Sequence, residues 1–317
     1  MTINLVAICG PTASGKTRIG VAVAQAIGGE IISVDSRQVY RGLDLGSGKD
    51  LSEYATPDGP VPYHLIDCAD PGDIYTLWHY QRDFYRAFNE IRERGRMPVA
   101  VGGTGLYLEA VLKGYDIPNV PEDPVLRRQL MNEEKPVLEN RLHQLDPARY
   151  ERTDRSSKKR IVRALEVSLA GKPPDHAAVP AARPDIRPLV IGVRSDRAVL
   201  HDRIRTRLDA RFAAGMVDEV RRLLDAGVSR DRMELFGLEY RHITRHLLDS
   251  VPFTTMREEL LRDIRRLAKR QQTWFRGMER RGIAVTWVAN ADTTAAVGTV
   301  REELERQQEQ PPVHGAG

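Results

Sequence analysis

Residues 3–27 read INLVAICGPTASGKTRIGVAVAQAI, and this stretch decides the fold of the chain. It begins with an apolar run typical of a buried strand and ends in a segment whose apolar residues recur with helical spacing. Between them, residues 10–17 fit the phosphate-binding P-loop pattern GxxxxGK[ST] in the strand–loop–helix context that it requires. In such a loop, backbone N–H groups surround phosphate oxygens, the lysine supplies positive charge and the last hydroxyl can bind Mg²⁺. The sequence therefore predicts a phosphate cradle formed by Gly10, Pro11, Thr12, Ala13, Ser14, Gly15, Lys16 and Thr17, with Thr17 as a metal ligand.

Strand-like and helix-like segments alternate through much of the remaining chain. Further apolar runs have the length of buried strands, at residues 30–34, 63–67, 97–101, 189–193 and 285–288. Segments with helical periodicity lie at residues 77–94, 198–226, 234–248 and 256–278. This alternation predicts an α/β fold, with a parallel sheet of the P-loop NTPase type flanked by helices.

A helical insert interrupts the alternating pattern. Residues 124–144 and 156–170 are predominantly helical, and a Pro-rich linker follows at residues 172–188. We therefore expect a core domain formed by residues 1–118 and 188–290 and a helical insert domain at residues 119–187. The polar end of the chain, rich in Gln, Pro and Gly, predicts a flexible tail at residues 291–317.

Composition narrows the class of protein. The chain has 317 residues, of which 41% are hydrophobic and 29% charged, values typical of a folded globular protein. Its two cysteines, Cys9 and Cys68, form no disulfide framework or zinc-binding pattern. The apolar run at residues 3–9 is too short to span a membrane and lacks a basic flank. We expect a cytoplasmic protein without a membrane anchor.

Charge is distributed unevenly and predicts a polyanionic partner. Residues 1–124 carry 11 basic and 16 acidic side chains, whereas residues 125–317 carry 37 and 28. Lys159, Arg160 and Arg163 share one helix face within a basic segment. A second basic stripe recurs at three- and four-residue steps, with Trp274 and Phe275 interleaved: Arg262, Arg266, Lys269, Thr273 and Arg276. Either stripe alone fits a solvated helix face, but the pair favours nucleic-acid contacts.

Two further loops are expected beside the phosphate cradle. Asp35 ends the strand at residues 30–34, and the carboxyl ends of parallel strands face the ligand crevice of such sheets. Its carboxylate could be a general base, a helix N-cap or a group that hydrogen-bonds a ligand of Mg²⁺. The glycine-rich loop at residues 102–107 also follows a strand, so its backbone N–H groups and the Thr104 hydroxyl are candidate donors.

Six motifs in one order resemble the tRNA dimethylallyltransferase (tRNA isopentenyltransferase) family. They are GPTASGKT at 10–17, SVDSRQVYRGL at 33–43, YHLID at 63–67, GGTGLY at 102–107, RIVRALEV at 160–167 and KRQQTWFR at 269–276. The resemblance extends from about residue 5 to residue 288. It implies transfer of a dimethylallyl group from dimethylallyl diphosphate to N6 of the adenosine 3′-adjacent to the anticodon in tRNA, with Mg²⁺ as cofactor.

The resemblance also implies roles for individual residues. Asp35 matches the general base, Thr104 a hydroxyl that hydrogen-bonds the diphosphate, and Arg207 an arginine that clamps it. The tRNA anticodon arm would be bound by Asp35, Ser36, Arg37, Gln38, Lys159, Arg160, Arg163, Lys269, Arg270, Gln271, Thr273, Trp274 and Arg276. Two segments depart from the common family pattern: GSGKD at 46–50, where many members have GTAKP, and FGLEYR at 236–241.

Three other functions are open on sequence alone. A P-loop kinase of a small metabolite would use the same cradle, but two basic stripes with aromatic residues do not favour it. An isopentenyltransferase of free adenine nucleotides would not need an insert of this length. A non-catalytic RNA-binding protein would not need a complete phosphate cradle beside Asp35. We expect a monomer.

Overall fold

The computed structural model describes residues 2–171 and 183–309. Its strands are β1 (Leu5–Cys9), β2 (Glu30–Val34), β3 (Ala55–Thr56), β4 (Gly59–Pro60), β5 (Tyr63–His64), β6 (Pro98–Gly102), β7 (Pro188–Arg194) and β8 (Thr286–Ala289). Its helices up to β7 are α1 (Lys16–Ile27), the 3₁₀ helix η1 (Leu51–Tyr54), α2 (Leu77–Glu93), α3 (Gly105–Lys113), α4 (Pro124–Asn132), α5 (Lys135–Leu145), α6 (Pro147–Arg152) and α7 (Lys158–Leu169). Those beyond it are α8 (Arg197–Ala213), α9 (Met216–Asp225), α10 (Arg230–Leu235), α11 (Leu238–Leu248), α12 (Phe253–Arg280) and α13 (Thr293–Glu309). None of the helices in these described ranges is long and apolar enough to cross a membrane.

The chain forms two compact units, one of which contains a parallel six-stranded sheet. The strand order is β5-β2-β6-β1-β7-β8, and every neighbouring pair is parallel. Pairing aligns Cys9 of β1 and Val34 of β2 with Gly102 of β6. Three adjacent strands therefore end at the same level, which confirms the predicted P-loop type of sheet.

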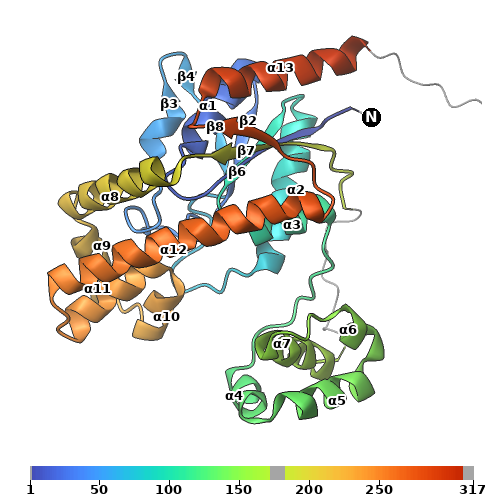
Figure 1. Cartoon of the computed structure of the whole chain (residues 1–317), viewed down its shortest axis with the longest axis vertical. Helices are drawn as coiled ribbons and strands as arrows, with labels where there is room; N and C mark the ends of the chain where they lie inside the picture. Colours follow the sequence, from blue (N-terminus) through green and yellow to red (C-terminus); the bar gives the residue numbers. More distant parts are fainter. Residues whose placement is uncertain (1, 172–182, 310–317) are drawn as a thin grey trace, which may run out of the picture. The chain divides into compact units, whose positions relative to one another are not determined.

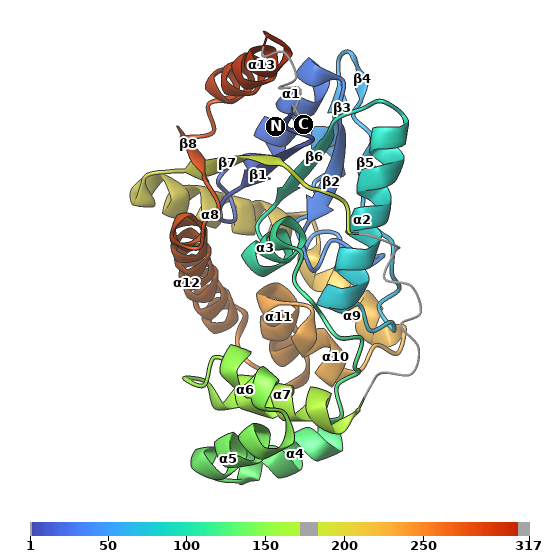
Figure 2. The ribbon, with the colours of Figure 1, turned by 90° about the vertical axis from the view of Figure 1, so that its right-hand side faces the viewer.

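Helices cover both faces of the sheet because the strands alternate their side chains. From β1, Leu5 and Ala7 face α2, α3 and the end of α12, whereas Val6 and Ile8 face α1 and α13. Figure 2 shows the strands side by side with α2 along one flank. The residue sets are nearly all apolar, so burial drives the packing of both layers.

The end of the chain differs from our expectation of a flexible tail at residues 291–317. Residues 293–309 form α13, which packs against α1 (Figure 1). Ala296 and Val300 are fully buried in the layer that α1 shares with the sheet. Their four-residue spacing places both on one helix face, and Val297 and Leu304 pack beside them against the same layer. Residues 310–317 lie outside the described residues.

A helical region, α8 to α12, follows β7 in the same unit. Its core joins α8, α9, α11 and α12 to the segment after β2, through residues such as Leu208, Val220, Tyr240 and Leu43. The expected helices at 198–226 and 234–248 each divide into two. One division falls at Gly215 and the other at Gly237, both at positive φ. Glycine adopts that conformation without steric cost, so each helix can end and a new one begin.

The second unit starts at Asp116, and the chain returns to the first unit at Arg183. These bounds differ by a few residues from the expected insert at 119–187. The unit contains α4 to α7 around a small core of its own: Leu130, Leu138, Leu142, Ile161, Val162, Ala164 and Leu165. The expected helix at 124–144 divides because Pro136, in the first turn of α5, favours a helix start. Most of the expected Pro-rich linker, residues 172–182, lies outside the described residues.

Candidate active site

The carboxyl ends of β1, β2 and β6 bring three loops together. Gly102, at the end of β6, permits this approach, since a Cβ there would lie 2.0 Å from the carbonyl oxygen of Val34. The backbone N–H of Thr104 donates to the same carbonyl oxygen at 3.2 Å. The phosphate loop, the loop carrying Asp35 and the loop carrying Thr104 therefore form one edge, as the sequence predicts.

The phosphate loop has the backbone that a cradle requires. Ala13 and Gly15 are at positive φ, 60° and 84°, which turns successive N–H groups inward. The Lys16 ammonium donates to the Pro11 carbonyl oxygen at 3.3 Å. Burial, together with the nearby Arg207 guanidinium, lowers the pKa of Lys16 to about 8. An anion bound in the loop would favour the charged form of this lysine.

Asp35 and Thr104 are fixed by backbone groups. The Oδ1 atom of Asp35 accepts from the N–H groups of Arg37 at 2.8 Å and Gln38 at 3.4 Å. These contacts leave the Oδ2 atom available for a proton. The Thr104 hydroxyl oxygen accepts from the N–H of Ser36 at 3.2 Å, so its own proton can be donated to a ligand.

Gln271 of α12 links two of these loops. Its Oε1 atom accepts from the Thr12 N–H at 2.8 Å, and its Nε2 atom donates to the Gly103 carbonyl oxygen at 2.9 Å. We expected Gln271 to contact tRNA, but here both ends of its amide bind the protein. The geometry instead gives this side chain the task of setting the distance between the phosphate loop and the loop of Thr104.

A cavity of about 650 Å³ extends over this edge. It is lined by Lys16 and Thr17 from the cradle, by Asp35 and Thr104, and by α12. A second cavity, of about 560 Å³, shares Lys16, Thr17 and Arg207 with the first. Phosphate-binding groups and a carboxylate thus face one cavity that is large enough for a small ligand together with a nucleobase.

Two arginines on α8 lie beside the cradle. Arg207, to which the family resemblance assigns a role in clamping the diphosphate, and Arg211 lie one helical turn apart. Their Nη2 atoms are 3.7 Å and 3.8 Å from Oδ2 of Asp50. Arg211 was not predicted, because only the fold brings α8 against the loop at residues 46–50.

The two segments that depart from the family pattern pack against each other. A Cβ on Gly46 would lie 2.6 Å from the Tyr240 ring. The Glu219 carboxylate accepts from the Tyr240 hydroxyl at 2.7 Å and from the N–H groups of Leu45 and Gly46 at 2.7 and 3.0 Å. The departures therefore form a single contact beside the cavity.

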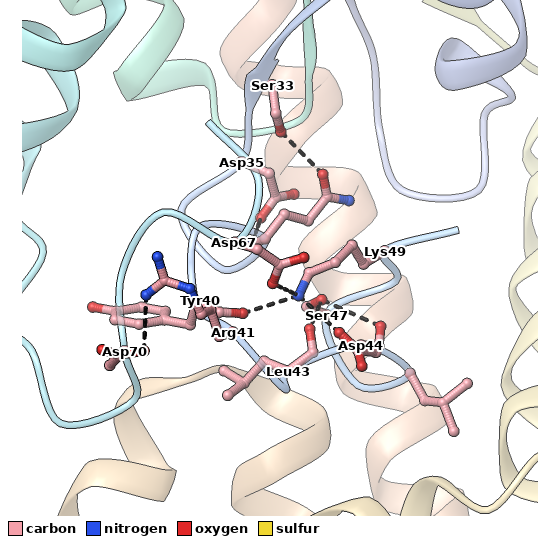
Figure 3. A network of polar contacts seen from close by, with 12 residues as sticks. Ser33, Asp35, Tyr40, Arg41, Leu43, Asp44, Ser47, Lys49, Asp67 and Asp70 are labelled. Carbon is pink, nitrogen blue, oxygen red and sulfur yellow. Dashed lines mark hydrogen bonds and ion pairs between the residues drawn. The ribbon is translucent and has the colours of Figure 1, made fainter. Parts of the chain in front are cut away.

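A buried ammonium anchors the same loop (Figure 3). Lys49 Nζ donates to Asp44 Oδ1 at 2.8 Å, to Asp67 Oδ1 at 2.5 Å and to the Tyr40 carbonyl oxygen at 2.9 Å. Asp67 was expected at the end of a strand. Instead β5 ends at His64, and Asp67, with φ of 53°, lies in the turn beyond it. This turn directs its carboxylate to Lys49.

Comparison with known proteins agrees with this geometry. Residues 38–278 match the family described as IPP transferase, and residues 3–56 match isopentenyl transferase. The chain belongs to the IPP transferase family. A relative named tRNA dimethylallyltransferase 2, from Syntrophotalea carbinolica, is 49% identical over 92% of this chain and 96% of its own. A tRNA dimethylallyltransferase 1 from Geotalea daltonii is 47% identical over 92% of each chain.

Solved structures of the IPP transferase family have the same fold. A tRNA isopentenylpyrophosphate transferase from Bacillus halodurans superimposes with a TM-score of 0.69 at 34% identity, covering 96% of this chain and 98% of that one. A eukaryotic dimethylallyltransferase acting on tRNA has a TM-score of 0.74 at 21% identity, covering 98% and 81%. The likeness at low identity shows that the architecture tolerates extensive sequence change.

Of the two basic helices in this IPP transferase, α12 has the more accessible charges. Arg262, Lys269 and Arg276 are exposed, with no ion-pair partner among residues 2–171 and 183–309. Arg270 and Trp274 line the larger cavity. Phe275, which we expected in the stripe, is instead buried beneath the sheet layer.

Two of the three expected RNA-binding residues on α7 already form contacts within the protein. Arg163 donates to the Val120 carbonyl oxygen at 2.6 Å and lies 3.5 Å from the Glu166 carboxylate. Arg160 forms an ion pair with Asp154. Lys159 is exposed, and no described residue forms an ion pair with it.

Oxygen donors suited to Mg²⁺ lie near the cradle. Thr17 and Glu53 line the smaller cavity, and hydroxyl and carboxylate oxygens are the ligands that Mg²⁺ prefers. Within the described ranges, no group of three or more His, Cys, Asp or Glu side chains is arranged to hold a metal by itself. These residues fit an ion that takes its other ligands from a diphosphate and water.

Proposed function

We propose that this chain transfers the dimethylallyl group of dimethylallyl diphosphate to N6 of the adenosine 3′-adjacent to the anticodon of tRNA, releasing diphosphate. Family membership supports the reaction class, since relatives that span nearly the whole chain are named tRNA dimethylallyltransferases. The residue roles below rest on the geometry of the first unit.

The observation that carries this proposal is that one cavity contains both a phosphate cradle and an available carboxylate oxygen. In the reaction, the bond between the allylic carbon and the diphosphate oxygen breaks while a bond from N6 to that carbon forms. The N6 proton passes to Oδ2 of Asp35, and the electron pair of the broken bond leaves with the diphosphate. A carboxylate within hydrogen-bond reach of the amine is suited to this transfer.

The cradle stabilises the leaving group. The N–H groups of the phosphate loop, the Lys16 ammonium and the Arg207 guanidinium would neutralise the charge that develops on the diphosphate, and the Thr104 hydroxyl would donate to it. Thr17 would hold Mg²⁺, with the Glu53 carboxylate nearby. When bound, that ion supplies further neutralisation of the diphosphate.

The RNA partner is the anticodon arm. An adenosine within that arm must leave its stack before its amino group can reach Asp35. The exposed cations of α12 would bind the RNA backbone near the cavity, and Ser36, Arg37, Gln38 and Thr273 would lie close to the extruded base. Lys159 on α7 would supply a separate backbone contact. We infer that the protein works as a monomer in the cytoplasm, where tRNA is modified.

The test is nucleoside mass spectrometry. An anticodon stem-loop RNA is incubated with the protein, Mg²⁺ and dimethylallyl diphosphate, digested and analysed. We expect the mass gain of one prenyl group on adenosine and none on a matched RNA with guanosine at that position. Parallel incubations use AMP as acceptor, or ATP with hydroxylated metabolites as acceptors. Modification confined to AMP, or phosphate transfer from ATP without prenylation, would overturn the proposal.

A further inference from the structure

Asp50 provides charge to the arginine pair on α8 but no hydrogen bond. Its Oδ2 atom is 3.7 Å from Arg207 Nη2 and 3.8 Å from Arg211 Nη2, and both distances exceed the usual hydrogen-bond length. Nearly half of the Asp50 side chain is exposed, whereas that of Arg211 is 11% exposed. The Asp50 carboxylate can therefore turn into solvent, whereas the Arg211 guanidinium stays buried.

Several nitrogens of this pair lack a hydrogen-bond acceptor. Nε of Arg207 and both Nε and Nη2 of Arg211 are buried without a partner among the described residues. An unsatisfied buried donor is costly, and more so when it is charged. Such atoms are uncommon in folded proteins, and a bound ion, water or ligand is one explanation for them.

The loop at residues 46–50 is shaped to bring backbone against this pair. Gly48 has φ of 74°, and a Cβ there would lie 2.2 Å from Arg207 Nη2 and 2.0 Å from Arg211 Nη2. A Cβ here would require the guanidinium groups to move, and glycine also adopts this φ without steric cost. Lys49, with its three oxygen partners, fixes the next residue (Figure 3), so the loop holds its position beside α8.

Charge at the cradle matches a diphosphate. Lys16, Arg207 and Arg211 all line the larger cavity, and positively charged side chains that line a cleft favour an anion such as a diphosphate ester. Arg207 and Arg211 repel each other, and burial together with Arg207 lowers the pKa of Arg211 to about 10. An anion that accepts hydrogen bonds from both guanidinium groups would relieve this repulsion and satisfy the unpartnered donors.

We propose that Arg211 is a second guanidinium ligand of the donor's diphosphate, and that Asp50 is an internal counter-ion which the diphosphate replaces. The inference rests on the proposed function for the identity of the donor. The inference goes beyond the proposed function because it assigns opposite effects on diphosphate binding to Arg211 and Asp50. Neither residue was predicted as a site residue. Arg211 strengthens diphosphate binding, and Asp50 weakens it and so favours release of the product.

A structural role for Arg211 predicts a different outcome. Glu239 also lies near enough to attract Arg211, so the arginine could serve only to balance that carboxylate within the fold. In that case, a lysine at position 211 would preserve the balance and diphosphate affinity together. As a two-donor ligand, Arg211 cannot be replaced by lysine, whose ammonium lacks the planar fork.

The test is calorimetric titration of the full chain with inorganic diphosphate in the presence of Mg²⁺. We expect Arg211→Met to raise the dissociation constant roughly tenfold to a hundredfold, as the loss of charge-assisted hydrogen bonds does. Arg211→Lys should restore only part of the affinity, and Asp50→Asn should tighten binding several-fold. Matched controls are Arg221→Met and Asp70→Asn, which remove exposed charges paired elsewhere. Both controls should bind as the wild type does.

Wild-type affinity in both Arg211→Met and Asp50→Asn would overturn the inference, as would full rescue by lysine. If Arg211→Met does not fold, as judged by its circular dichroism, Asp50→Asn decides alone because it removes only a half-exposed carboxylate. Prenyl transfer is measured in parallel. A wild-type protein that does not prenylate RNA contradicts the proposed function, whereas unchanged diphosphate binding in the variants of an active enzyme contradicts only this inference.

Discussion

At the carboxyl edge of the sheet, the polar side chains accept hydrogen bonds from backbone N–H groups, whereas the basic side chains of α7 and α12 either pair with acceptors of their own unit or are exposed without an ion-pair partner among the described residues. Asp35 and Thr104 each accept a hydrogen bond from the backbone. This leaves Oδ2 of Asp35 and the hydroxyl proton of Thr104 for a ligand. Arg163 is tied to its own unit, while Lys269 extends into solvent. The difference fits the proposed function: catalysis needs groups that are fixed before the ligand binds, whereas contacts to an RNA backbone need accessible charge.

The largest effect is expected from Asp35→Asn, which keeps an oxygen to accept the backbone N–H groups but cannot take a proton. Prenyl transfer should slow by about 10² to 10⁴, the usual contribution of a positioned general base. RNA affinity should remain close to that of the wild type. Single-turnover kinetics and RNA binding on the same preparation measure both quantities. Turnover near the wild-type rate would exclude Asp35 as the base and leave it as a turn-stabilising residue.

The next largest effect is expected on α12. Arg262, Lys269 and Arg276 are seven residues apart and exposed, so they face the same side of the helix. Replacing all three with alanine should make the slope of log affinity against log salt shallower by about 2, at about 0.7 per phosphate of unpaired RNA.

Arg257→Ala is the matched control, since Arg257 is on the same helix but pairs with Asp209. Filter binding of an anticodon stem-loop at several salt concentrations gives both slopes. An equal change in the control and the triple variant would mean that net charge, and not this face, determines binding.

A smaller effect concerns pH. Lys16, with a pKa of about 8, is charged below that pH and becomes neutral above it. Donor affinity should therefore fall as pH rises, roughly fivefold between pH 8 and pH 9, as the protonated fraction decreases. In Arg207→Gln, loss of the neighbouring positive charge should move this decline to higher pH. Dissociation constants of the donor from pH 7 to 9.5 measure the shift. An unchanged midpoint would show that Arg207 does not influence the pKa of Lys16.

The smallest effect is expected on α7. Lys159→Ala should change the salt slope by about 0.7, one phosphate contact. Arg163→Ala should leave the slope unchanged and instead destabilise the insert by about 1–2 kcal/mol, since it loses hydrogen bonds to Val120 and Glu166. Salt titrations and thermal unfolding distinguish the two. A slope change in Arg163→Ala without loss of stability would show that this arginine leaves its internal partners to bind RNA.

The chemistry-bearing edge was predictable because each of its loops directly follows a strand. The P-loop pattern, Asp35 and Thr104 lie in short motifs whose local order already fixes their place at the end of β1, β2 or β6. The parallel sheet then brings these ends together without further information from the sequence. Family resemblance contributed the reaction, which phosphate chemistry alone leaves open.

The parts that were missed depend on contacts between distant segments. Arg211 becomes a candidate only when α8 packs beside Gly48, and Gln271 changes from an RNA contact to a link because α12 crosses the phosphate loop. The helix α13 gives a weak signal, because its polar composition conceals Ala296 and Val300 on one face. On α7, the hydrogen bond from Arg163 to Val120 likewise depends on a segment 43 residues away, although the Glu166 partner lies on the same helix.

The turn between β8 and α13 has a consequence for the order in which the site matures during synthesis. Ala291 lies against the phosphate loop, since a Cβ built on Gly15 would be 2.6 Å from the Cβ of Ala291. The carbonyl oxygen of Ala291 accepts a hydrogen bond from Arg18 at 3.2 Å. The cradle leaves the ribosome early, but its supporting residue and the strand β7 beside β1 emerge far later. A nascent chain therefore carries the lysine and hydroxyl of the cradle for most of its translation without the backing that fixes them. We therefore expect the cradle to reach its final geometry only after β7 and the turn at Ala291 have folded against it.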